Sequence, residues 1–113
     1  MENCIFCAIS KHESPAEIVY EDSDMISFVD VNPKTKIHLL IVPKKHIASV
    51  TQLKDEDALL VGKMMLAAKK IAESKGLADD GYRLCINAGR HGGQVVDHLH
   101  LHLMGGGKMN QMV

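Results

Sequence analysis

Short blocks of β-branched, aliphatic and aromatic residues recur along the chain, separated by polar or glycine-rich segments, and each block predicts a β-strand. The five blocks are residues 17–21, 25–30, 38–42, 82–87 and about 95–104. The first two flank the polar turn segment Asp22-Ser23-Asp24 and therefore predict a β-hairpin. The third block is stopped by Pro43.

The period of the apolar positions changes to that of a helix between about residues 55 and 75. An apolar side chain returns every three or four residues, at Leu60, Met64, Ala67, Ala68 and Ile71. Acidic residues stand at the start of this segment and lysines toward its end, which suits the helix dipole, and Gly76 is a natural C-cap. A second, short helix is predicted over residues 4–11, ending before Pro15.

The order hairpin, strand, helix, two strands lacks the regular alternation of strands and helices that builds a parallel sheet. We therefore expect an α+β fold, an antiparallel sheet of about five strands with the long helix packed on one face and a short N-terminal helix. No repeat or linker divides the chain, so residues 1–113 are expected to form a single domain. Such a sheet leaves its other face or an edge uncovered, which predicts a homodimer.

The composition narrows the classes of function. With 113 residues, 46% of them hydrophobic and 24% charged, the chain matches an ordinary globular domain and not a disordered one. A formal net charge of −1 offers no basic surface for nucleic acid. No apolar run approaches the roughly 20 residues that cross a bilayer, so no membrane partner is expected. The first residues lack the features of a signal peptide, and we expect the protein in the cytoplasm, where cysteines stay reduced.

Histidine is the residue type that points to a function. The chain has seven histidines but only two tyrosines and two phenylalanines. His98, His100 and His102 alternate with leucines in the last predicted strand. Side chains alternate between the faces of a strand, so these imidazoles would form a row at spacings of about 7 Å, with the leucines in the core. Such a row can bind a metal, exchange protons or supply a nucleophilic nitrogen. The alternative is an amphipathic strand whose polar face happens to be histidine.

A glycine-rich loop leads into the histidine segment. Gly92, Gly93 and Gln94 offer backbone N–H groups that side chains obstruct little, an arrangement suited to phosphate oxygens. On its own such a loop is more often a plain turn. Beside three histidines it favours an anionic ligand, with phosphate as the leading candidate. His12 and His91 lie in polar segments and are expected to be solvated surface residues.

The segment 92–106, GGQVVDHLHLHLMGG, resembles the signature of the histidine triad (HIT) superfamily, and its trailing Gly-Gly resembles the branch of histidine triad nucleotide-binding (Hint-like) proteins. Blocks similar to those of the family occur in the same order at 28–33, 38–46 and 81–87. The resemblance implies a homodimeric α+β fold. It also implies a hydrolase of purine nucleoside phosphoramidates or related nucleoside monophosphate esters, with AMP- or GMP-like ligands and no organic cofactor.

By resemblance, the middle histidine, His100, is the nucleophile and forms a covalent nucleotidyl-histidine, which water then cleaves. Neutral imidazole suits both steps, because it is a good nucleophile at pH 7 and a good leaving group once protonated. His102 and His38 would contact phosphate oxygens or help to protonate the leaving group.

The resemblance also implies the nucleotide-binding residues. Asn87 and Gln94 would orient phosphate or leaving-group atoms, Asp30 would accept hydrogen bonds from the ribose hydroxyls, and Phe28 would line the base pocket. Three of these four residues also have a purely structural interpretation. Phe28 is then a core residue, and Asp30 and Asn87 are turn residues.

Three further positions near the triad carry expectations. Gly93 belongs to the phosphate loop, and Val95 stands where the Hint-like branch often has a serine, which removes a hydroxyl from the phosphate or the leaving group. Asp97 would point to the leucine face of the strand, so it requires an exposed or edge position.

Cys4 and Cys7 form a C-x-x-C pair, which is metal-ligand spacing. A thioredoxin-type redox pair would need a preceding strand and a βαβ context that this segment lacks, and two buried hydrophobic cysteines are the remaining alternative. By resemblance to the family members that carry zinc, the ligands are Cys4, Cys7, His46 and His98, a closed structural site. Cys85 alternates with apolar neighbours and is expected to be a packing residue.

Three other functions remain open at this point. A dinucleoside polyphosphate hydrolase shares the triad, and a regulatory protein would bind the nucleotide with little turnover. A metalloenzyme would use the three histidines as an open metal site. The metalloenzyme is disfavoured because no acidic ligand motif follows the histidines.

Overall fold

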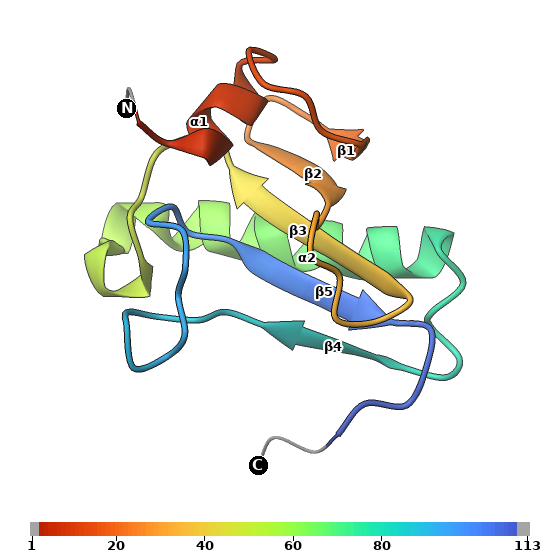
Figure 1. Ribbon diagram of the computed structural model, residues 1–113. Helices are drawn as coiled ribbons and strands as arrows, with labels where there is room; N and C mark the ends of the chain where they lie inside the picture. The colour runs from red at the N-terminus through yellow and green to blue at the C-terminus, as the bar shows by residue number, and fades with distance from the viewer. Residues whose placement is uncertain (1–2, 111–113) are drawn as a thin grey trace.

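The computed structural model describes residues 3–110 and contains one antiparallel sheet with two helices (Figure 1). Along the chain the elements are α1 (Ile5–Ser10), β1 (Ile18–Glu21), β2 (Met25–Val29), β3 (Ile37–Pro43), two 3-10 turns (Val50–Gln52 and Asp55–Asp57), α2 (Ala58–Ser74), β4 (Tyr82–Cys85) and β5 (Leu101–Gly105). The predicted α+β class, the five-stranded sheet and both helices are confirmed. The prediction of a single domain over 1–113 includes residues 1–2 and 111–113, which lie outside the described residues.

The strand order in the sheet is β1-β2-β3-β5-β4, and each neighbouring pair is antiparallel. β1 and β2 form the predicted hairpin. β3 is the central strand, because it pairs with β2 on one side and with β5 on the other. Figure 1 shows α2 lying across one face of the sheet and α1 lying near the β2 end.

The long helix packs as its apolar period predicts. Its buried residues are Met64, Ala67, Ala68, Ile71 and Ala72. They form the larger core together with Leu39 and Ile41 of β3 and Leu101 and Leu103 of β5. After the helix, Gly76 has a φ of 74°, a left-handed conformation that favours glycine at this position. No helix among residues 3–110 is long and apolar enough to cross a membrane.

The opposite face of the sheet carries a smaller apolar cluster, and α1 covers part of it. Phe6 and Ile9 of α1 pack there with Ile26 and Phe28 of β2 and with Leu40 of β3. The other face or an edge of the sheet was expected to be uncovered, and α1 covers part of that face. The same face also holds a cavity.

The last strand begins later than the sequence predicts. β5 starts at Leu101, so His102 is the only one of the three alternating histidines that lies in a strand. His98 and His100 lie in the segment that leads into β5. The prediction of three imidazoles in one row on a strand is therefore wrong for the first two.

A contact from outside the sheet explains the late start of β5. The backbone N–H of Leu99 donates to the carbonyl oxygen of Ile47 at 2.6 Å, in the segment that follows β3. Residues 98–101 are all buried, so burial does not alternate as it would along a two-faced strand. Asp97 lies in a bend before this segment and is exposed, so its carboxylate remains in contact with water, as a charged group without a partner requires.

Candidate active site and metal site

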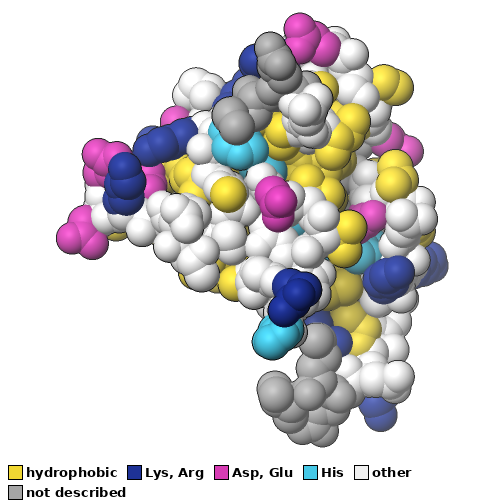
Figure 2. All heavy atoms as spheres, turned by 60° about the vertical axis from the view of Figure 1, so that its left-hand side comes forward, with side chains coloured by type: hydrophobic (Ala, Val, Ile, Leu, Met, Phe, Trp, Pro, Cys, Tyr) yellow, Lys and Arg dark blue, Asp and Glu magenta, His cyan; other side chains and the backbone are white. Residues whose placement is uncertain are grey.

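A cavity of about 740 Å³ opens on the face of the sheet opposite α2. One part of its lining is apolar and includes Phe6 and Ile9 of α1 and Phe28 of β2. The histidines that line it are His38, His100 and His102. Figure 2 shows histidine and hydrophobic side chains next to one another on one face of the molecule. A polar end beside an apolar end suits a ligand that has a charged group and a flat apolar group.

A main-chain hydrogen bond fixes the tautomer of His100. Nδ1 of His100 lies 2.7 Å from the carbonyl oxygen of His98. Because a carbonyl oxygen only accepts, Nδ1 carries the proton and donates it. The other ring nitrogen, Nε2, keeps its lone pair. The residue is 6% exposed and lines the cavity, so it is arranged to act as a nucleophile or a base.

A chain of hydrogen bonds leads to His102. The backbone N–H of Lys34 donates to Nδ1 of His38 at 2.9 Å, so the proton of the neutral His38 ring is on Nε2. This Nε2 lies 2.9 Å from Nδ1 of His102 and donates to it. Nε2 of His102 therefore carries the proton of that ring. Both nitrogens of His38 are thus hydrogen-bonded within the protein, whereas Nε2 of His102 has a proton to donate to a ligand in the cavity.

Burial keeps both of these rings neutral. Burial lowers the pKa of His38, and the nearby Asp30 carboxylate opposes this only in part. Burial, followed by the positive charges that His100 and His38 would carry, lowers the pKa of His102 to about 4. An ordinary histidine titrates near pH 6.5, so at neutral pH these two rings are uncharged donors and acceptors.

Asp30 and Phe28 each combine a structural position with a place in the cavity lining. Oδ1 of Asp30 accepts the backbone N–H of Asn32 at 2.8 Å, and Oδ2 lies 3.3 Å from Nε2 of His38. Phe28 is 3% exposed and belongs to the smaller apolar cluster. The turn and core alternatives are thus compatible with the site. Contacts of these residues to ribose and base stay predictions.

The loop between β4 and the histidines borders the cavity. Nδ2 of Asn87 donates to the carbonyl oxygen of Gly92 at 2.7 Å, and Asn87 itself lines the cavity. Gly93 also lines it, with a φ of 83° that glycine adopts without strain. Asn87 therefore holds the glycine-rich loop while it also lines the cavity.

Gln94 lies differently from its predicted role. Its Nε2 donates to the carbonyl oxygens of Ala48 and Val96 at 2.7 and 2.9 Å, and its Oε1 accepts the backbone N–H of Gly89 at 2.9 Å. Both ends of the amide are thus used to hold the loop, and the residue is not part of the cavity lining among residues 3–110. The next residue, Val95, is 91% exposed and lies in the lining.

Some cavity residues on α1 and β4 are not predicted by the sequence patterns. Phe6 and Ile9 belong to a helix that was assigned no ligand contact, and Arg83 lines the polar part. Cys85, predicted to be a packing residue, also lines the cavity, and its Cα pairs with that of His102 across the sheet. The available signal is alternation along the strand, since Cys85 shares its face with Asn87.

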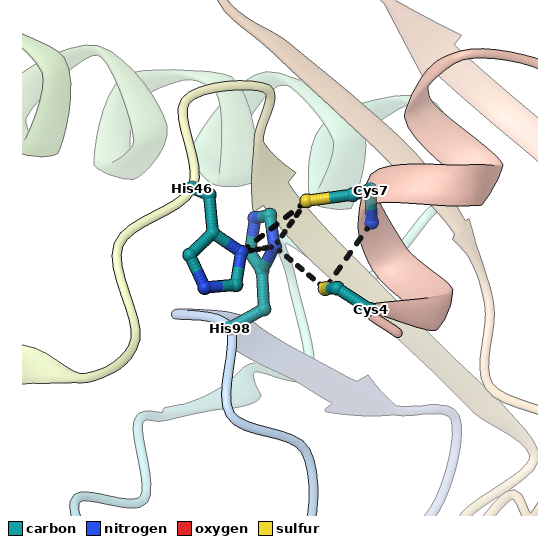
Figure 3. A group of neighbouring side chains, drawn as sticks. All are labelled: Cys4, Cys7, His46 and His98. Carbon is teal, nitrogen blue, oxygen red and sulfur yellow. Dashed lines mark hydrogen bonds between the residues drawn. The ribbon is translucent and has the colours of Figure 1, made fainter. Parts of the chain in front are cut away.

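A second group of side chains gathers at the start of α1 (Figure 3). Cys4 and Cys7 come from this helix and its N-cap, His46 from the segment after β3, and His98 from the segment before β5. All four donor atoms lie within 4.8 Å of one another. Nδ1 of His98 is 3.2 Å from Sγ of Cys4, and Nδ1 of His46 is 3.2 Å from Sγ of Cys7. The structure thus brings together the four residues that the resemblance implies.

The geometry of this group fits a tetrahedral metal ion. Typical Zn–N and Zn–S bond lengths place the donor atoms of a tetrahedral site roughly 3.3–3.8 Å apart, close to the spacing observed here. His98 is 0% exposed, and its Nε2 lies 2.8 Å from the carbonyl oxygen of Pro43, to which it donates. Its Nδ1 is therefore free of a proton and can bind a metal. Two thiolates and two imidazoles are a donor set typical of structural zinc sites.

Asp30, His38 and His102 also bring three donor atoms within 4.8 Å, but their hydrogen bonds do not fit a metal. A neutral imidazole that binds a metal through Nε2 has its proton on Nδ1. In His38 this Nδ1 accepts the backbone N–H of Lys34, so no proton can be there. The cluster is explained by hydrogen bonding among its members. The alternative of an open three-histidine metal site loses support too, since His98 lies in the four-ligand group.

Comparison with known proteins shows which family the chain resembles over nearly its whole length. The family model described as "Scavenger mRNA decapping enzyme C-term binding" matches residues 3–112. Protein HitA of Neisseria gonorrhoeae is 50% identical over 105 residues, which cover 93% of this chain and 97% of that protein. Purine nucleoside phosphoramidase of Escherichia coli K12 is 43% identical over 112 residues, covering 99% and 94%.

Solved structures show the same fold. A HIT family hydrolase from Legionella pneumophila Philadelphia 1 has a TM-score of 0.96 at 45% identity, covering 97% of this chain and 98% of that chain. A zinc-bound histidine triad family protein from Mycobacterium smegmatis has a TM-score of 0.81 at 35% identity, covering 91% and 74%. With sequence, fold and site in agreement, the chain belongs to the histidine triad (HIT) family.

Proposed function

We propose that the protein is a nucleotide hydrolase of the histidine triad type, acting on purine nucleoside phosphoramidates and related nucleoside monophosphate esters. The observation that carries this proposal is the hydrogen bond from His100 to the His98 carbonyl, which leaves Nε2 of a cavity-lining imidazole free to attack phosphorus. The relative named purine nucleoside phosphoramidase supports the substrate class. The apolar walls formed by Phe6 and Phe28 suit a purine base.

In the first step the lone pair on Nε2 of His100 attacks the α-phosphorus. A bond from phosphorus to His100 forms as the bond to the leaving nitrogen breaks, and the leaving nitrogen takes up one proton and departs as an amine. We assign delivery of this proton to the His38–His102 pair, through Nε2 of His102. The pair is neutral in the free protein, and the negative charge of a bound phosphate favours uptake of one further proton. This uptake requires Nδ1 of His38 to release the backbone N–H of Lys34, and the pair returns to its neutral form when Nε2 of His102 gives a proton to the leaving nitrogen.

In the second step water attacks the phosphorus of the nucleotidyl-histidine. The bond to Nε2 of His100 breaks, the proton of the water passes to His102, and the nucleoside monophosphate is released. The backbone at Gly93 would contact phosphate oxygens during both steps, because it lines the cavity in an open glycine conformation.

We further propose that Cys4, Cys7, His46 and His98 hold a structural zinc ion. The donor set and spacing support this, and the Mycobacterium smegmatis neighbour is zinc-bound. All four positions of a tetrahedron are filled by protein atoms, so none is left for substrate. Metal binding needs reduced cysteines, which supports the cytoplasmic location expected from the sequence.

A homodimer is the proposed assembly. α2 exposes Leu59, Met65 and Leu66 at 70%, 44% and 60% of their surface. A single exposed leucine is ordinary, but Leu59 and Leu66 are seven residues apart and therefore share one face of the helix, and Met65 lies beside Leu66. We propose that a second copy of this chain covers this patch.

Replacing the proposed nucleophile tests the main proposal. We expect His100→Ala to lower the turnover of adenosine 5′-phosphoramidate by about a thousandfold or more while AMP still binds, because the variant cannot form the covalent intermediate. The matched control is His12→Ala, a histidine whose side chain is 54% exposed, and it should keep full activity. Turnover that survives His100→Ala would defeat the assignment. A wild-type protein that binds AMP but does not turn over would favour the regulatory alternative.

The lowered pKa of His102 predicts a specific titration. Below its pKa an imidazole is charged, so between about pH 4 and the ordinary value near 6.5 His102 should remain neutral where a solvated histidine is charged. Imidazole NMR of the free protein over pH 4–8 measures this. Adding AMP should raise the pKa by one unit or more through the phosphate charge. A free-protein titration of His102 near pH 6.5 would contradict the proposed neutral state.

Metal analysis tests the zinc site. Purified wild type should contain one zinc ion per chain, and Cys4→Ala should lose most of it because three ligands do not close the site. Cys85→Ala is the matched control, since it removes a cysteine that lies in the cavity lining and not in the four-ligand group, and it should keep its zinc. Equal zinc content in all three proteins would refute the assignment.

The assembly is tested by placing a charge on the α2 patch. Leu66→Glu should convert a dimer to a monomer in sedimentation velocity, because a carboxylate cannot be buried there without a partner. Val50→Glu changes an apolar residue of similar type, 39% exposed on a 3-10 turn, and should leave the dimer intact. The patch is not the interface if both variants sediment like wild type.

A further inference from the structure

The helix α1 takes part in both the metal site and the active site. Cys4 caps its N-terminus, and Sγ of Cys4 accepts the backbone N–H of Cys7 at 3.4 Å. Phe6 lies between these two ligands in the sequence and is 6% exposed. It also lines the cavity. One short helix therefore carries two metal ligands and a wall of the ligand cavity.

The ring of Phe6 packs against the ring of the proposed nucleophile. Its centroid lies 5.2 Å from that of His100, with an angle of 81° between the two planes. It packs in the same edge-to-face manner against His98 at 6.0 Å and against Phe28 at 5.4 Å. Edge-to-face pairs at these separations are favourable and have a defined orientation, so Phe6 constrains the rings that it touches.

His100 needs such a constraint. Its ring makes one hydrogen bond within residues 3–110, from Nδ1 to the His98 carbonyl, which fixes one corner of the ring but permits the ring to tilt about that corner. The ring of His102 packs on it at 4.9 Å and 62°. Phe6 supplies a further contact, and a tilt of the imidazole would move Nε2 away from the line of attack on phosphorus.

We propose that Phe6 is a positioning residue, which keeps the ring of His100 oriented so that Nε2 faces bound phosphate, and that the metal site holds Phe6 in place. The proposal rests on the proposed function of His100 as the nucleophile. α1 has six residues, too few to be stable alone, so its position depends on the apolar cluster and on the ligands Cys4 and Cys7. Metal binding thereby acts on the nucleophile through an aromatic contact, without touching the substrate.

A matched pair of variants separates positioning from base binding. Phe6→Leu and Phe28→Leu make the same change in two buried residues of one apolar cluster that both line the cavity. Of the two, Phe6 is the one whose ring packs on His100. With zinc-loaded protein and adenosine 5′-phosphoramidate, Phe6→Leu should lower kcat by about threefold to tenfold, the range that one aromatic pair supplies. Phe28→Leu should raise KM with kcat changed less than about twofold.

A second readout does not depend on turnover. Long-range proton–nitrogen NMR at fixed pH should show a single Nδ1–H tautomer for His100 in the zinc-loaded wild type and in Phe28→Leu. Phe6→Leu should show averaging with the other tautomer, because a tilted ring loses the His98 carbonyl. Removing the metal from wild type should have the same effect, and removing it from Phe6→Leu should add little. Circular dichroism confirms that each variant is folded, and Phe6→Met replaces Phe6→Leu if the latter is not.

The outcomes separate the two proposals. Identical His100 spectra in wild type and Phe6→Leu, or a rise in KM alone for both variants, would overturn the positioning role and leave Phe6 as a wall of the pocket. Absence of turnover in the wild type would defeat the proposed function, and the imidazole spectra would then decide whether Phe6 orients the ring.

Discussion

Hydrogen bonds between histidine rings and the main chain determine what each ring can do. The carbonyl of Pro43 takes the Nε2 proton of His98, which frees Nδ1 for a metal. The carbonyl of His98 takes the Nδ1 proton of His100, which frees Nε2 for phosphorus. The backbone N–H of Lys34 donates to Nδ1 of His38, so the proton of that ring is on Nε2 and is donated to Nδ1 of His102. The proton of His102 is therefore on Nε2. Under the proposed function, one side-chain type would thus serve as metal ligand, nucleophile and acid according to the backbone group that holds it.

Local patterns predict most of the fold but not the course of the chain around the histidines. The hairpin, β3 and α2 follow from β-branched runs and from a 3.6-residue period, which depend on neighbouring residues only. The start of β5 depends on a bond from Leu99 to Ile47, which is more than fifty residues away in the sequence. The alternation of His and Leu does not reveal this long-range hydrogen bond. The strand predicted from the alternation therefore begins too early, at about residue 95, whereas β5 begins at Leu101.

The candidate site also has features that could be predicted from the sequence and features that only the fold reveals. The resemblance predicted the group of Cys4, Cys7, His46 and His98 from three distant segments, whereas spacing alone identified only Cys4 and Cys7 as candidate ligands. The resemblance did not predict that the side-chain amide of Gln94 is used in hydrogen bonds that hold the loop. This bonding depends on the position of the Ala48 carbonyl oxygen, which only the fold determines. Alternation places Cys85 on the face of Asn87, yet only the fold shows that this face borders the cavity.

The exposure of Val31 and Val95, at 89% and 91%, has a consequence for how this protein can diverge. Both residues line the cavity while burying almost none of their surface, so exchanging them costs little folding free energy. The buried imidazoles that line the same cavity cannot be exchanged without a cost in folding free energy. Natural variation in which compounds are accepted should therefore accumulate at this entrance, while the chemistry stays constant.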